Sequence, residues 1–577
     1  MTYNVLAINP GHNGSAALVC DGKLELYIEE ERMTRMKYDG NPFRAMMYII
    51  DRYFINELII AGTGQENHSL PWTGEDSYAA LVRKYYPNVK ISRVGTHHHN
   101  GHAYSAFYNS GFETAAAVIV DGSGSIFGFK FSHQPGDTIE AFETETIYKC
   151  SYDEIKAVYK IGGNNGIPRI DAPDSQIDGT VSTVKAYEAV SEYLGFGFID
   201  AGKTMGLAPY GKEDPNIPNL FYGDTGRGDK NIFMTHYPAG ALIDSERIPY
   251  LKKPEDSKEW HHNPSKVTDA AKNLAWKVQQ ETQERVGDLI DKAVDITGET
   301  NIVISGGYGL NCVANYYFKE RFPELNIFVD PVAHDGGTSI GWAKHNSYQH
   351  CKNQNLDFET DPLTTLYLGP DYEYTVEDLE HFKDIEISDA NNASIAKLIS
   401  EKNIVAMFQG RAEAGPRALG NRSILYDPTD VNGKDFVNGV KGREWFRPFA
   451  GTVLKEHASE WFDLRGMDET PYMMYAVELQ TKAIGELPAI THVDGTCRVQ
   501  TVTEEQNKNY YDLINEFYKL SDVPVLFNTS FNLAGEPLVE DLKDAIHTLR
   551  SSKIEYLYFP EMGKLVTLKN VEETTEE

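Results

Sequence analysis

A short apolar strand followed by a glycine-rich polar turn occurs twice in this chain, and this repeat constrains the fold more than any other feature. In the first copy, residues 5–8 lead into a turn at 9–15, and further strands are expected at 16–20 and 24–28. In the second copy, the apolar run 115–120 is followed by DGSGS and then by IFGFKF. Apolar runs bounded by Gly, Asn, Asp and Ser predict strands joined by tight turns. Two such units predict a duplicated α/β fold.

The rest of the chain continues this mixed pattern. A third apolar strand, 302–305, ends in two glycines, and residues 257–298 carry apolar side chains at every third or fourth position, which predicts a helix. The segment 353–366 is polar, contains a proline and lacks periodicity, so it is interpreted as a linker. Residues 395–408 predict a helix followed by a strand.

Charge and cysteine content narrow the class of protein. The formal net charge of −31 argues against a protein that coats nucleic acid or an anionic membrane, although a local basic pocket is compatible with it. Five scattered cysteines without a Cys-x-x-Cys spacing predict neither a disulfide framework nor a zinc knuckle, and they indicate a reducing cytoplasm. The N-terminus predicts a strand rather than a signal peptide, and no apolar run predicts a membrane span. A homodimer is compatible with the sequence.

Histidines cluster in THHHNGHAYSAF, residues 96–107. On a helix, His98 and His102 are four residues apart and share one face. Two imidazoles on one face form half of a metal site, which carboxylates from elsewhere can complete. Asp121 and Asp335 each stand beside glycines and are candidates for these carboxylates. The alternatives are histidines that bond the backbone at a polar helix start, and ordinary turns at the two aspartates.

Two glycine-rich segments are candidates for phosphate contacts. SGGYGLN, residues 305–311, follows a strand and precedes helical residues, so its glycines can contact a nucleotide. Its spacing fits neither a dinucleotide fingerprint nor a P-loop. GKTMGLAPYG, residues 202–211, is expected to form a loop that brings Lys203 to a phosphate. A structural turn is the alternative for each segment.

A basic segment, residues 411–447, stands out in this acidic chain. Its cations are spaced irregularly, which predicts that they converge from loops and strand ends on one anion, since Arg forks match phosphate or carboxyl oxygens. These cations are Arg411, Arg417, Arg422, Lys434, Lys441, Arg443 and Arg447. A surface cluster paired with carboxylates is the alternative. Farther on, VPVLFNTSFN, residues 523–532, predicts a strand ending in small polar residues that suit a nucleotide or acyl phosphate, and Arg498 lies upstream of it.

Four motifs in this order, HHNGHA, MGLAPYG, GPRALGNRS and NTSFNLAGEP, resemble the O-carbamoyltransferase family of nodulation and antibiotic-tailoring enzymes. The resemblance covers nearly the whole chain. It implies an N-terminal domain, residues 1–366, with a duplicated actin/hexokinase-like ATPase fold similar to the threonylcarbamoyl-transferring enzyme of tRNA modification. It also implies a smaller C-terminal α/β domain, residues 367–577, that forms carbamoyl-adenylate.

The resemblance implies a two-stage reaction that uses ATP and an iron-type divalent metal, with Mg as a further ion for ATP. Carbamoyl phosphate and ATP react in the C-terminal domain to give carbamoyl-adenylate, pyrophosphate and phosphate. An acceptor hydroxyl then attacks the carbamoyl carbon in the N-terminal domain. Both phosphate substrates are strongly anionic, so several arginines and lysines are needed to bring them together.

The motifs also imply roles for individual residues. The metal ligands are His98, His102 and Asp335, with Asp121 nearby. The adenylate is held by Gly306, Gly307 and Asn311, and Lys203 approaches its phosphate. The residues implied for the C-terminal domain are Arg417, Lys441, Arg447 and Arg498 for carbamoyl phosphate, and Asn528 and Ser530 for the nucleotide.

The attacking hydroxyl needs a proton acceptor within hydrogen-bond reach, and His12 in the first turn is the candidate. A structural histidine is the alternative at this position. With Lys203 and Arg417, His12 completes the expected catalytic set. The first turn of the family usually reads His-Asp-Ser, whereas here it reads His12-Asn13-Gly14-Ser15. The missing carboxylate weakens any assignment of a second base to this turn.

The acceptor is predicted from composition and resemblance together. The chain is rich in Tyr (34 residues), Lys, Asn and acidic residues, unlike the Ala- and Arg-rich antibiotic-tailoring enzymes, which favours another source such as a virus. The resemblance extends to phage-type enzymes that decorate hydroxymethylated pyrimidines in DNA. We therefore expect a hydroxymethylcytosine acceptor, in DNA or as a nucleotide. DNA would require a local basic channel, and a duplex would require a flipped-out base.

Three other functions remain as alternatives. The acceptor can be a sugar hydroxyl of a small-molecule natural product. A tRNA threonylcarbamoyl transfer would instead require bicarbonate and threonine. From a different class, the chain can be a nucleotide-regulated binding protein with an inactive catalytic centre, although the intact basic and histidine clusters disfavour it.

Overall fold

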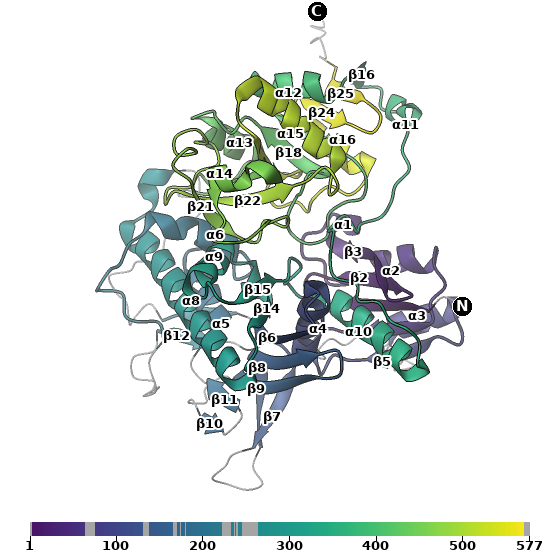
Figure 1. The fold of residues 1–577 in the computed structure, drawn as a ribbon, viewed down its shortest axis with the longest axis vertical. Helices are drawn as coiled ribbons and strands as arrows, with labels where there is room; N and C mark the ends of the chain where they lie inside the picture. Colours follow the sequence, from purple (N-terminus) through teal and green to yellow (C-terminus); the bar gives the residue numbers. More distant parts are fainter. Residues whose placement is uncertain are drawn as a thin grey trace, which may run out of the picture. The chain divides into compact units, whose positions relative to one another are not determined.

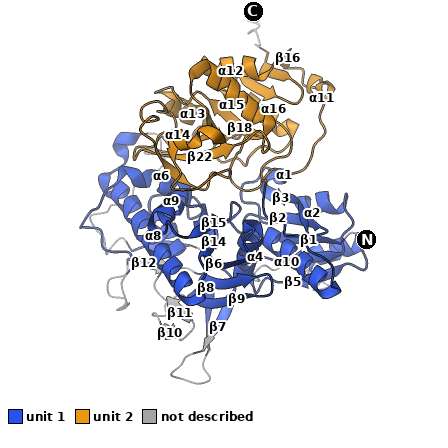
Figure 2. Ribbon diagram, in the orientation of Figure 1, with its two compact units in different colours: residues 1–364 blue, residues 365–577 orange. Residues whose placement is uncertain are grey.

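The computed structural model describes residues 3–63, 76–130, 138–164, 170–172, 175–178, 181–221, 232–235, 237, 240–244 and 263–569. The chain divides into two compact units, Met1–Thr364 and Thr365–Glu577 (Figure 2). The boundary that the sequence predicts, after residue 366, lies two residues from this division. None of the helices in the described part of the chain has the length and apolarity that a membrane crossing requires.

The first unit begins with a five-stranded sheet in the order β3-β2-β1-β4-β5. The strands are β1 (Asn4–Asn9), β2 (Ser15–Cys20), β3 (Lys23–Glu29), β4 (Glu57–Ile60) and β5 (Lys90–Arg93). The first three are antiparallel neighbours, and β1 runs parallel to β4 and β4 to β5. The three strands predicted at the N-terminus are confirmed. Helices α1 (Glu30–Thr34), α2 (Phe43–Ile50) and α3 (Ser77–Tyr85) belong to the same half.

A second sheet repeats this order and these directions. Its path contains β9-β8-β6-β14-β15, with β6 antiparallel to β8, β8 antiparallel to β9, and β6, β14 and β15 parallel. The strands are β6 (Thr114–Val120), β8 (Thr138–Ser151), β9 (Ile155–Gly163), β14 (Asn301–Ser305) and β15 (Asn326–Val329). The prediction of a duplicated, actin/hexokinase-like α/β fold is therefore confirmed. Short strands β10 (Ile170–Ala172) and β11 (Ser175–Asp178) extend the edge at β9, and β12 (Phe233–Thr235) pairs with β13 (Ala241–Ile243).

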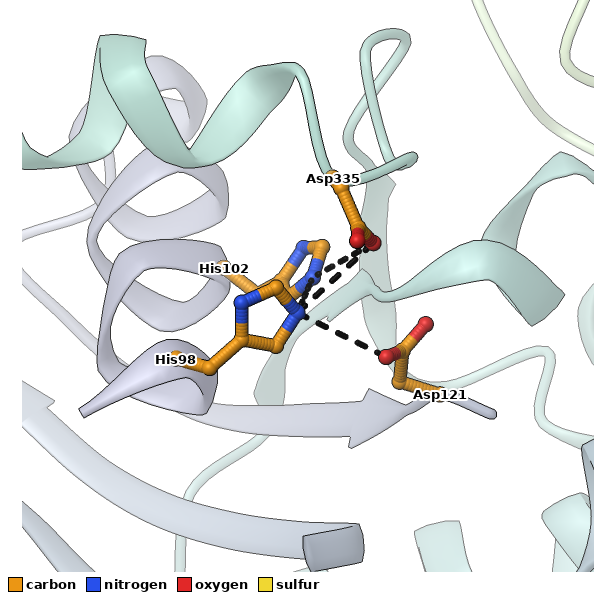
Figure 3. A group of neighbouring side chains, drawn as sticks. All are labelled: His98, His102, Asp121 and Asp335. Atoms are coloured by element: carbon orange, nitrogen blue, oxygen red, sulfur yellow. Dashed lines mark hydrogen bonds and ion pairs between the residues drawn. The ribbon is translucent and has the colours of Figure 1, made fainter. Parts of the chain in front are cut away.

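The turn DGSGS differs from its prediction. Its two flanking strands, β6 and β7 (Ile126–Lys130), do not form a hairpin with each other, because both pair with β8. Residues 121–125 interrupt the strand pairing along one edge of β8. The backbone N–H groups of Asp121 and Gly124 still donate hydrogen bonds to the carbonyl oxygens of Thr144 and Glu143. The side chain of Asp121 is thereby placed at the carboxyl end of β6, as Figure 3 shows.

The remaining helices of the first unit are α4 (His98–Ser110), α5 (Thr183–Tyr193), α6 (Ala201–Leu207), α8 (Asp269–Thr297), α9 (Cys312–Arg321) and α10 (Gly337–Gln354), with 3-10 turns η1 (Ala208–Tyr210), η2 (Pro264–Lys266) and η3 (Gly307–Leu310). Helix α4 packs on β6 and β14 of the second sheet, whereas α10 packs on β1 and β2 of the first (Figure 1). The long predicted helix is confirmed by α8, while residues 257–262 lie outside the described part. The loop expected at 202–211 is wrong, because most of it forms α6 and η1.

Helices α4 and α10 pack closely because glycines face each other across the contact. A Cβ at Gly341 would collide with the carbonyl oxygen of Gly101, and a Cβ at Gly101 would lie 2.8 Å from Cβ of Thr338. This approach brings the first turns of the two helices together. His98 and His102 lie at the start of α4 and Asp335 directly before α10, whereas Asp121 follows β6.

The predicted linker 353–366 is only partly correct. Its first residues belong to α10, and the next ones pack on the first unit. Phe358 lies with its ring centroid 4.6 Å from that of Tyr348, and a carboxylate oxygen of Asp361 accepts a hydrogen bond from the N–H of Leu24. Polarity and missing periodicity predict an extended segment, but they do not distinguish a free linker from a segment that packs against a domain.

The second unit is built on a ten-stranded mixed sheet in the order β16-β25-β24-β17-β18-β23-β19-β22-β21-β20. The strands are β16 (Ile385–Asp389), β17 (Val405–Phe408), β18 (Arg422–Tyr426), β19 (Ala450–Leu454), β20 (Phe462–Asp463), β21 (Ala476–Leu479), β22 (Thr496–Val502), β23 (Val525–Ser530), β24 (Tyr556–Phe559) and β25 (Lys564–Leu568). The helices are α11 (Val376–Glu380), α12 (Asn392–Ser400), α13 (Gly433–Lys441), η4 (Lys455–His457), α14 (Ala458–Trp461), α15 (Lys508–Ser521) and α16 (Leu542–Arg550). The predicted smaller α/β domain, and the helix and strand expected at 395–408, are confirmed.

Candidate functional site

Four buried side chains form one cluster in the first unit: His98, His102, Asp121 and Asp335 (Figure 3). Each offers a ligand atom, and these four atoms all lie within 4.8 Å of one another. Nε2 of His98 lies 3.6 Å from Oδ2 of Asp121 and 3.6 Å from Oδ1 of Asp335. Nε2 of His102 lies 3.7 Å from Oδ1 of Asp335. The structure thus brings together all four residues that the sequence singled out as metal ligands.

Contacts at the two Nδ1 atoms orient the imidazoles of His98 and His102 so that their Nε2 atoms face the centre of the cluster. Nδ1 of His98 lies 3.3 Å from the carbonyl oxygen of Gly62, which can only accept, so Nδ1 carries a proton and Nε2 faces the centre of the cluster. Nδ1 of His102 faces the hydroxyl of Ser305 at 3.4 Å. The two Nε2 atoms are only 3.2 Å apart. One proton can bridge the two Nε2 atoms at this distance, and a divalent metal in its place would find mixed imidazole and carboxylate ligands, so the donor set fits such an ion.

Both aspartates of the cluster are ionised. Burial by itself raises the pKa of Asp335, but the charges of His12 and His98 outweigh it and hold the pKa well below the ordinary value. Burial and the charge of Asp335 likewise raise the pKa of Asp121, while the hydrogen bond with His98 and the charge of His102 lower it, with a net lowering. Two buried carboxylates need compensating positive charge, which the histidines supply here and which a bound divalent cation would supply in their place.

Buried charged residues that the sequence analysis missed hold the segment before Asp335. Nε2 of His334 lies 2.9 Å from Oε1 of Glu29, and the other carboxylate oxygen of Glu29 lies 2.8 Å from a guanidinium nitrogen of Arg32. Such contacts between β3, α1 and the start of α10 join residues about 300 positions apart. No local pattern in the sequence signals them.

His12 lies beside the cluster, as expected, and Asp335 favours its protonated form. Its Nε2 is 3.2 Å from Oδ2 of Asp335, its Nδ1 is 2.9 Å from Oδ1 of Asn13, and its side chain is 54% exposed. The charge of Asp335 is the main cause that raises the pKa of His12. An imidazolium donates protons rather than accepting them, so this arrangement disfavours the base role predicted for His12.

The glycine-rich segment 305–311 lies directly beside the cluster. A Cβ at Gly306, whose φ is 88°, would collide with the carbonyl of Val120, so only glycine fits here. The N–H of Gly307 donates to Oδ1 of Asp121 at 3.0 Å. Asn311 already uses both ends of its amide, because Oδ1 caps α9 and Nδ2 donates to Gln279. The expected adenylate contacts of these residues therefore compete with structural hydrogen bonds.

Lys203 lies on α6 and forms an ion pair with Asp200 at 2.9 Å. Its helix reaches the end of the glycine-rich segment, because Sδ of Met205 lies 3.9 Å from Sγ of Cys312. The structure therefore places α6 next to the segment 305–311, and a phosphate contact of Lys203 stays a prediction.

The glycines of DGSGS make room for protein side chains. A Cβ at Gly122 would lie 2.7 Å from Oε1 of Glu188, and one at Gly124 would lie 2.8 Å from the ring of His99 and 3.0 Å from Oε2 of Glu143. From the sequence, Asp121 beside these glycines is expected only as a candidate metal ligand, with an ordinary turn as the alternative. Glu188 and Glu143 are site neighbours that the sequence did not reveal, since their distance along the chain hides them.

In the second unit, positive charge gathers around Arg443. Burial, followed by the charges of Arg447 and Arg498, holds the pKa of Arg443 well below its ordinary value. Its Nη1 and Nη2 donate to the hydroxyls of Thr529 and Ser530, each at 3.3 Å. Nζ of Lys441 bonds to the same Ser530. The predicted residues Lys441, Arg447, Arg498 and Ser530 therefore surround Arg443.

The carboxylate of Glu413 stabilises the loop that carries Arg417. One carboxylate oxygen of Glu413 accepts hydrogen bonds from the N–H groups of Leu419, Asn421 and Arg422, at 2.8, 2.8 and 3.1 Å. The amide of the fully buried Asn528 donates to the carbonyl of Ala418 at 3.2 Å. Asn528 therefore lies at this loop, one residue from Arg417.

The expectation that all cations of the basic segment converge on one anion is wrong for two of them. Arg422 is fully buried and donates to the backbone carbonyls of Gln409, Gly410 and Glu540. Arg411 donates to the carbonyls of Gly369 and Leu368. Irregular spacing along the sequence does not separate arginines that bind a ligand from arginines that satisfy the backbone.

Comparison with known proteins places the chain in a family. The model of the carbamoyltransferase N-terminus matches residues 81–344, and that of the carbamoyltransferase C-terminus matches residues 396–565. The nodulation protein NolNO of Sinorhizobium fredii is 31% identical over 95% of this chain and 78% of its own length. The chain belongs to the carbamoyltransferase family. It is an enzyme, and the predicted resemblance is confirmed.

Further relatives of this carbamoyltransferase include an enzyme whose name states its acceptor. The 3'-hydroxymethylcephem-O-carbamoyltransferase of Amycolatopsis lactamdurans is 25% identical over 94% of this chain and 95% of its own length. Among solved structures, full-length HypF with bound phosphate and nucleotide covers 62% of this chain and 56% of its own at 13% identity and a TM-score of 0.34, a distant likeness that adds nothing to the strand topology. The four-residue cluster lies in the N-terminal match of this carbamoyltransferase and the arginine cluster in its C-terminal match.

Proposed function

We propose that this carbamoyltransferase transfers a carbamoyl group to a hydroxyl in two ATP-dependent stages. Carbamoyl phosphate and ATP give carbamoyl-adenylate, pyrophosphate and phosphate in the second unit, and the carbamoyl group then goes to an acceptor hydroxyl in the first. One observation carries the proposal: a single carbamoyltransferase chain holds a cationic cluster around Arg443 and, in its other unit, an anionic cluster of histidines and aspartates.

The cationic cluster fits the first stage. Several guanidinium groups and an ammonium group around one volume neutralise the phosphates of carbamoyl phosphate and ATP. In this proposal Lys441, Arg447 and Arg498 bind carbamoyl phosphate together with Arg417. The nucleotide is contacted by Ser530 and, through the Arg417 loop, by Asn528.

The anionic cluster fits the second stage. A divalent cation held by His98, His102, Asp121 and Asp335 would polarise the carbamoyl group as a Lewis acid, which supplies several kcal/mol of transition-state stabilisation. The backbone of Gly306 and Gly307, with Asn311 and Lys203, would hold the adenylate. His12, as an imidazolium, would donate a hydrogen bond to the departing AMP.

For the acceptor, we propose the hydroxymethyl group of hydroxymethylcytosine, in DNA or as a nucleotide. The relative named for hydroxymethylcephem supports a hydroxymethyl acceptor as a class. The net charge of −31 repels a polyanion, which favours a free nucleotide over DNA.

The test is to supply carbamoyl phosphate and ATP with three acceptors in parallel: hydroxymethylated DNA, hydroxymethyl-dCMP and a set of sugars. We expect pyrophosphate release and a carbamoylated nucleoside by mass spectrometry. Transfer to a sugar alone would replace the proposed acceptor. Activity with bicarbonate and threonine, without carbamoyl phosphate, would support threonylcarbamoyl transfer instead. Pyrophosphate release that does not depend on carbamoyl phosphate would contradict the first stage.

A further inference from the structure

A buried ion pair on α5 has no role in the function described so far. Nζ of Lys185 lies 2.8 Å from Oε2 of Glu188, and the two side chains are only 2% and 12% exposed. Removing two charges from water is costly, and a buried pair is often replaceable by apolar residues without loss of stability. A pair of this kind is therefore a candidate for a function other than stability.

The pair lies beside the histidine–aspartate cluster. Oε1 of Glu188 is so close to the backbone that a Cβ at Gly122, the residue after Asp121, would lie 2.7 Å from it. The carboxylate also interacts electrostatically with Asp121 and with His12. Glu188 therefore approaches the cluster from α5, while Asp335 approaches it from the start of α10.

Transfer to a hydroxyl requires a group that accepts a proton. The acceptor loses its O–H proton when its oxygen bonds to the carbamoyl carbon, and Nε2 of His12 is already occupied by Asp335, whose Oδ2 lies 3.2 Å away. Asp121 and Asp335 belong to the metal-ligand set. Glu188 is a carboxylate near the cluster that is not needed as a ligand.

On the basis of the proposed function, we propose that Glu188 binds the acceptor hydroxyl and takes its proton during transfer. The hydroxyl oxygen forms a bond to the carbamoyl carbon, the proton moves to a carboxylate oxygen of Glu188, and AMP leaves with the electron pair of the broken C–O bond. Glu188 is then a catalytic residue, and Lys185 is a positioning residue that holds its carboxylate.

The charges around Glu188 suit this role. Burial is the main cause that raises the pKa of Glu188, Lys185 on the same helix lowers it, Asp121 in the loop 121–125 raises it, and His12 in the turn 9–15 lowers it. The net effect is a raised pKa, which makes the carboxylate a stronger base than an exposed glutamate.

The deciding experiment separates the two stages in the full-length enzyme loaded with its metal. Glu188→Gln keeps the shape of the side chain but removes the base. We expect pyrophosphate release within about 2-fold of wild type, and a loss of carbamoylated product of about 100-fold or more. Glu192→Gln, one turn farther along α5, is the matched control and should keep both rates.

The outcomes distinguish this inference from the proposed function. Full product formation by Glu188→Gln would overturn the role of Glu188 while leaving the two-stage reaction intact. A wild-type enzyme that releases no pyrophosphate with carbamoyl phosphate and ATP would instead overturn the proposed function. If circular dichroism shows that Glu188→Gln unfolds at a lower temperature than wild type, Glu188→Asp is tested instead. This variant keeps a base but moves it, so we expect a partial loss of product. An unaltered rate of product formation would contradict the role of Glu188.

Lys185→Gln supplies a readout that a purely structural role would not change. Without the ammonium group, the pKa of Glu188 rises, so the acid limb of the transfer rate should move to higher pH while the pyrophosphate-release profile stays in place. An acid limb at the wild-type position would show that Lys185 does not act through Glu188.

Discussion

The two charged clusters of this carbamoyltransferase differ in how far apart along the chain their residues lie. The histidine–aspartate cluster of the first unit draws its four side chains from α4, the end of β6 and the segment before α10, which span residues 98–335. The arginine–lysine cluster of the second unit takes most of its members from residues 441–447 and adds Arg498 and Ser530. The first therefore depends on the packing of a whole unit, and the second mainly on one segment and the strands beside it.

The sharpest way to break this comparison is Asp335→Asn. The substitution removes a ligand and a buried negative charge from the first cluster only. We expect the purified enzyme to lose its metal and product formation to fall by about 1,000-fold, with pyrophosphate release retained. Metal content by elemental analysis and the two rates are the measurements. Asp330→Asn is unsuitable as a control because Asp330 is buried next to the cluster, so Asp361→Asn on the extended segment serves instead.

The reciprocal change is Arg447→Ala. One charge-assisted contact to carbamoyl phosphate is lost, so KM for carbamoyl phosphate should rise by about 10- to 100-fold, which corresponds to about 1.5–3 kcal/mol. The metal content should not change. Steady-state kinetics and elemental analysis check both statements, with Lys434→Ala as the matched loss of a cation from the same basic segment. An unchanged KM would remove Arg447 from the substrate site.

Acid should lower the stability of the first unit through His345. Burial lowers the pKa of His345 to about 4, and the hydroxyl of Tyr108 lies 3.0 Å from its Nδ1. The unfolded chain binds a proton near pH 6.5 but the native one near pH 4, so this contribution to stability is complete above pH 6.5 and is lost as the pH falls toward 4. The loss should reach about 3 kcal/mol. Comparing urea unfolding of wild type and His345→Phe across this range isolates it, and parallel pH profiles would contradict it.

The smallest expected effect tests the packing that assembles the first cluster. Gly101→Ala places a methyl group 2.8 Å from Cβ of Thr338 and should push α10 away from α4. We expect about 1–3 kcal/mol of destabilisation and weaker metal binding. Gly439→Ala is the control, because a Cβ there meets no neighbour within 4 Å. Equal thermal stability and metal affinity of Gly101→Ala and wild type would show that this contact does not set the cluster.

Local pattern was enough to predict part of this site. The spacing of His98 and His102 fixes a shared helix face, and apolar runs beside glycines mark the strands that end at Asp121 and in Gly306. These features depend on neighbours within a few residues. The resemblance of four motifs then pointed to the carbamoyltransferase family, and the family match confirms it. The ATP-dependent stages, the metal and the acceptor stay predictions.

Long-range pairing is what the sequence could not supply. The partner of β6 is β8 rather than β7, and nothing within DGSGS encodes that choice. Arg422 looks like Arg447 in the sequence, yet it is buried against backbone carbonyls because β18 lies inside the sheet. Glu188 escaped notice because its approach to Gly122 exists only after α5 has packed.

The hydroxyl of Ser15 donates to the carbonyl of Gly336 at 2.8 Å, across 321 positions of the chain. This contact joins the first turn of the protein to the segment that bears Asp335, the last of the four proposed metal ligands. During synthesis, a ribosome must therefore complete more than half of the polypeptide before the site can close. Contacts of such large sequence separation form late in folding, so uptake of the ion should coincide with maturation of the whole first unit, and a nascent chain that ends before Asp335 should remain unable to retain it.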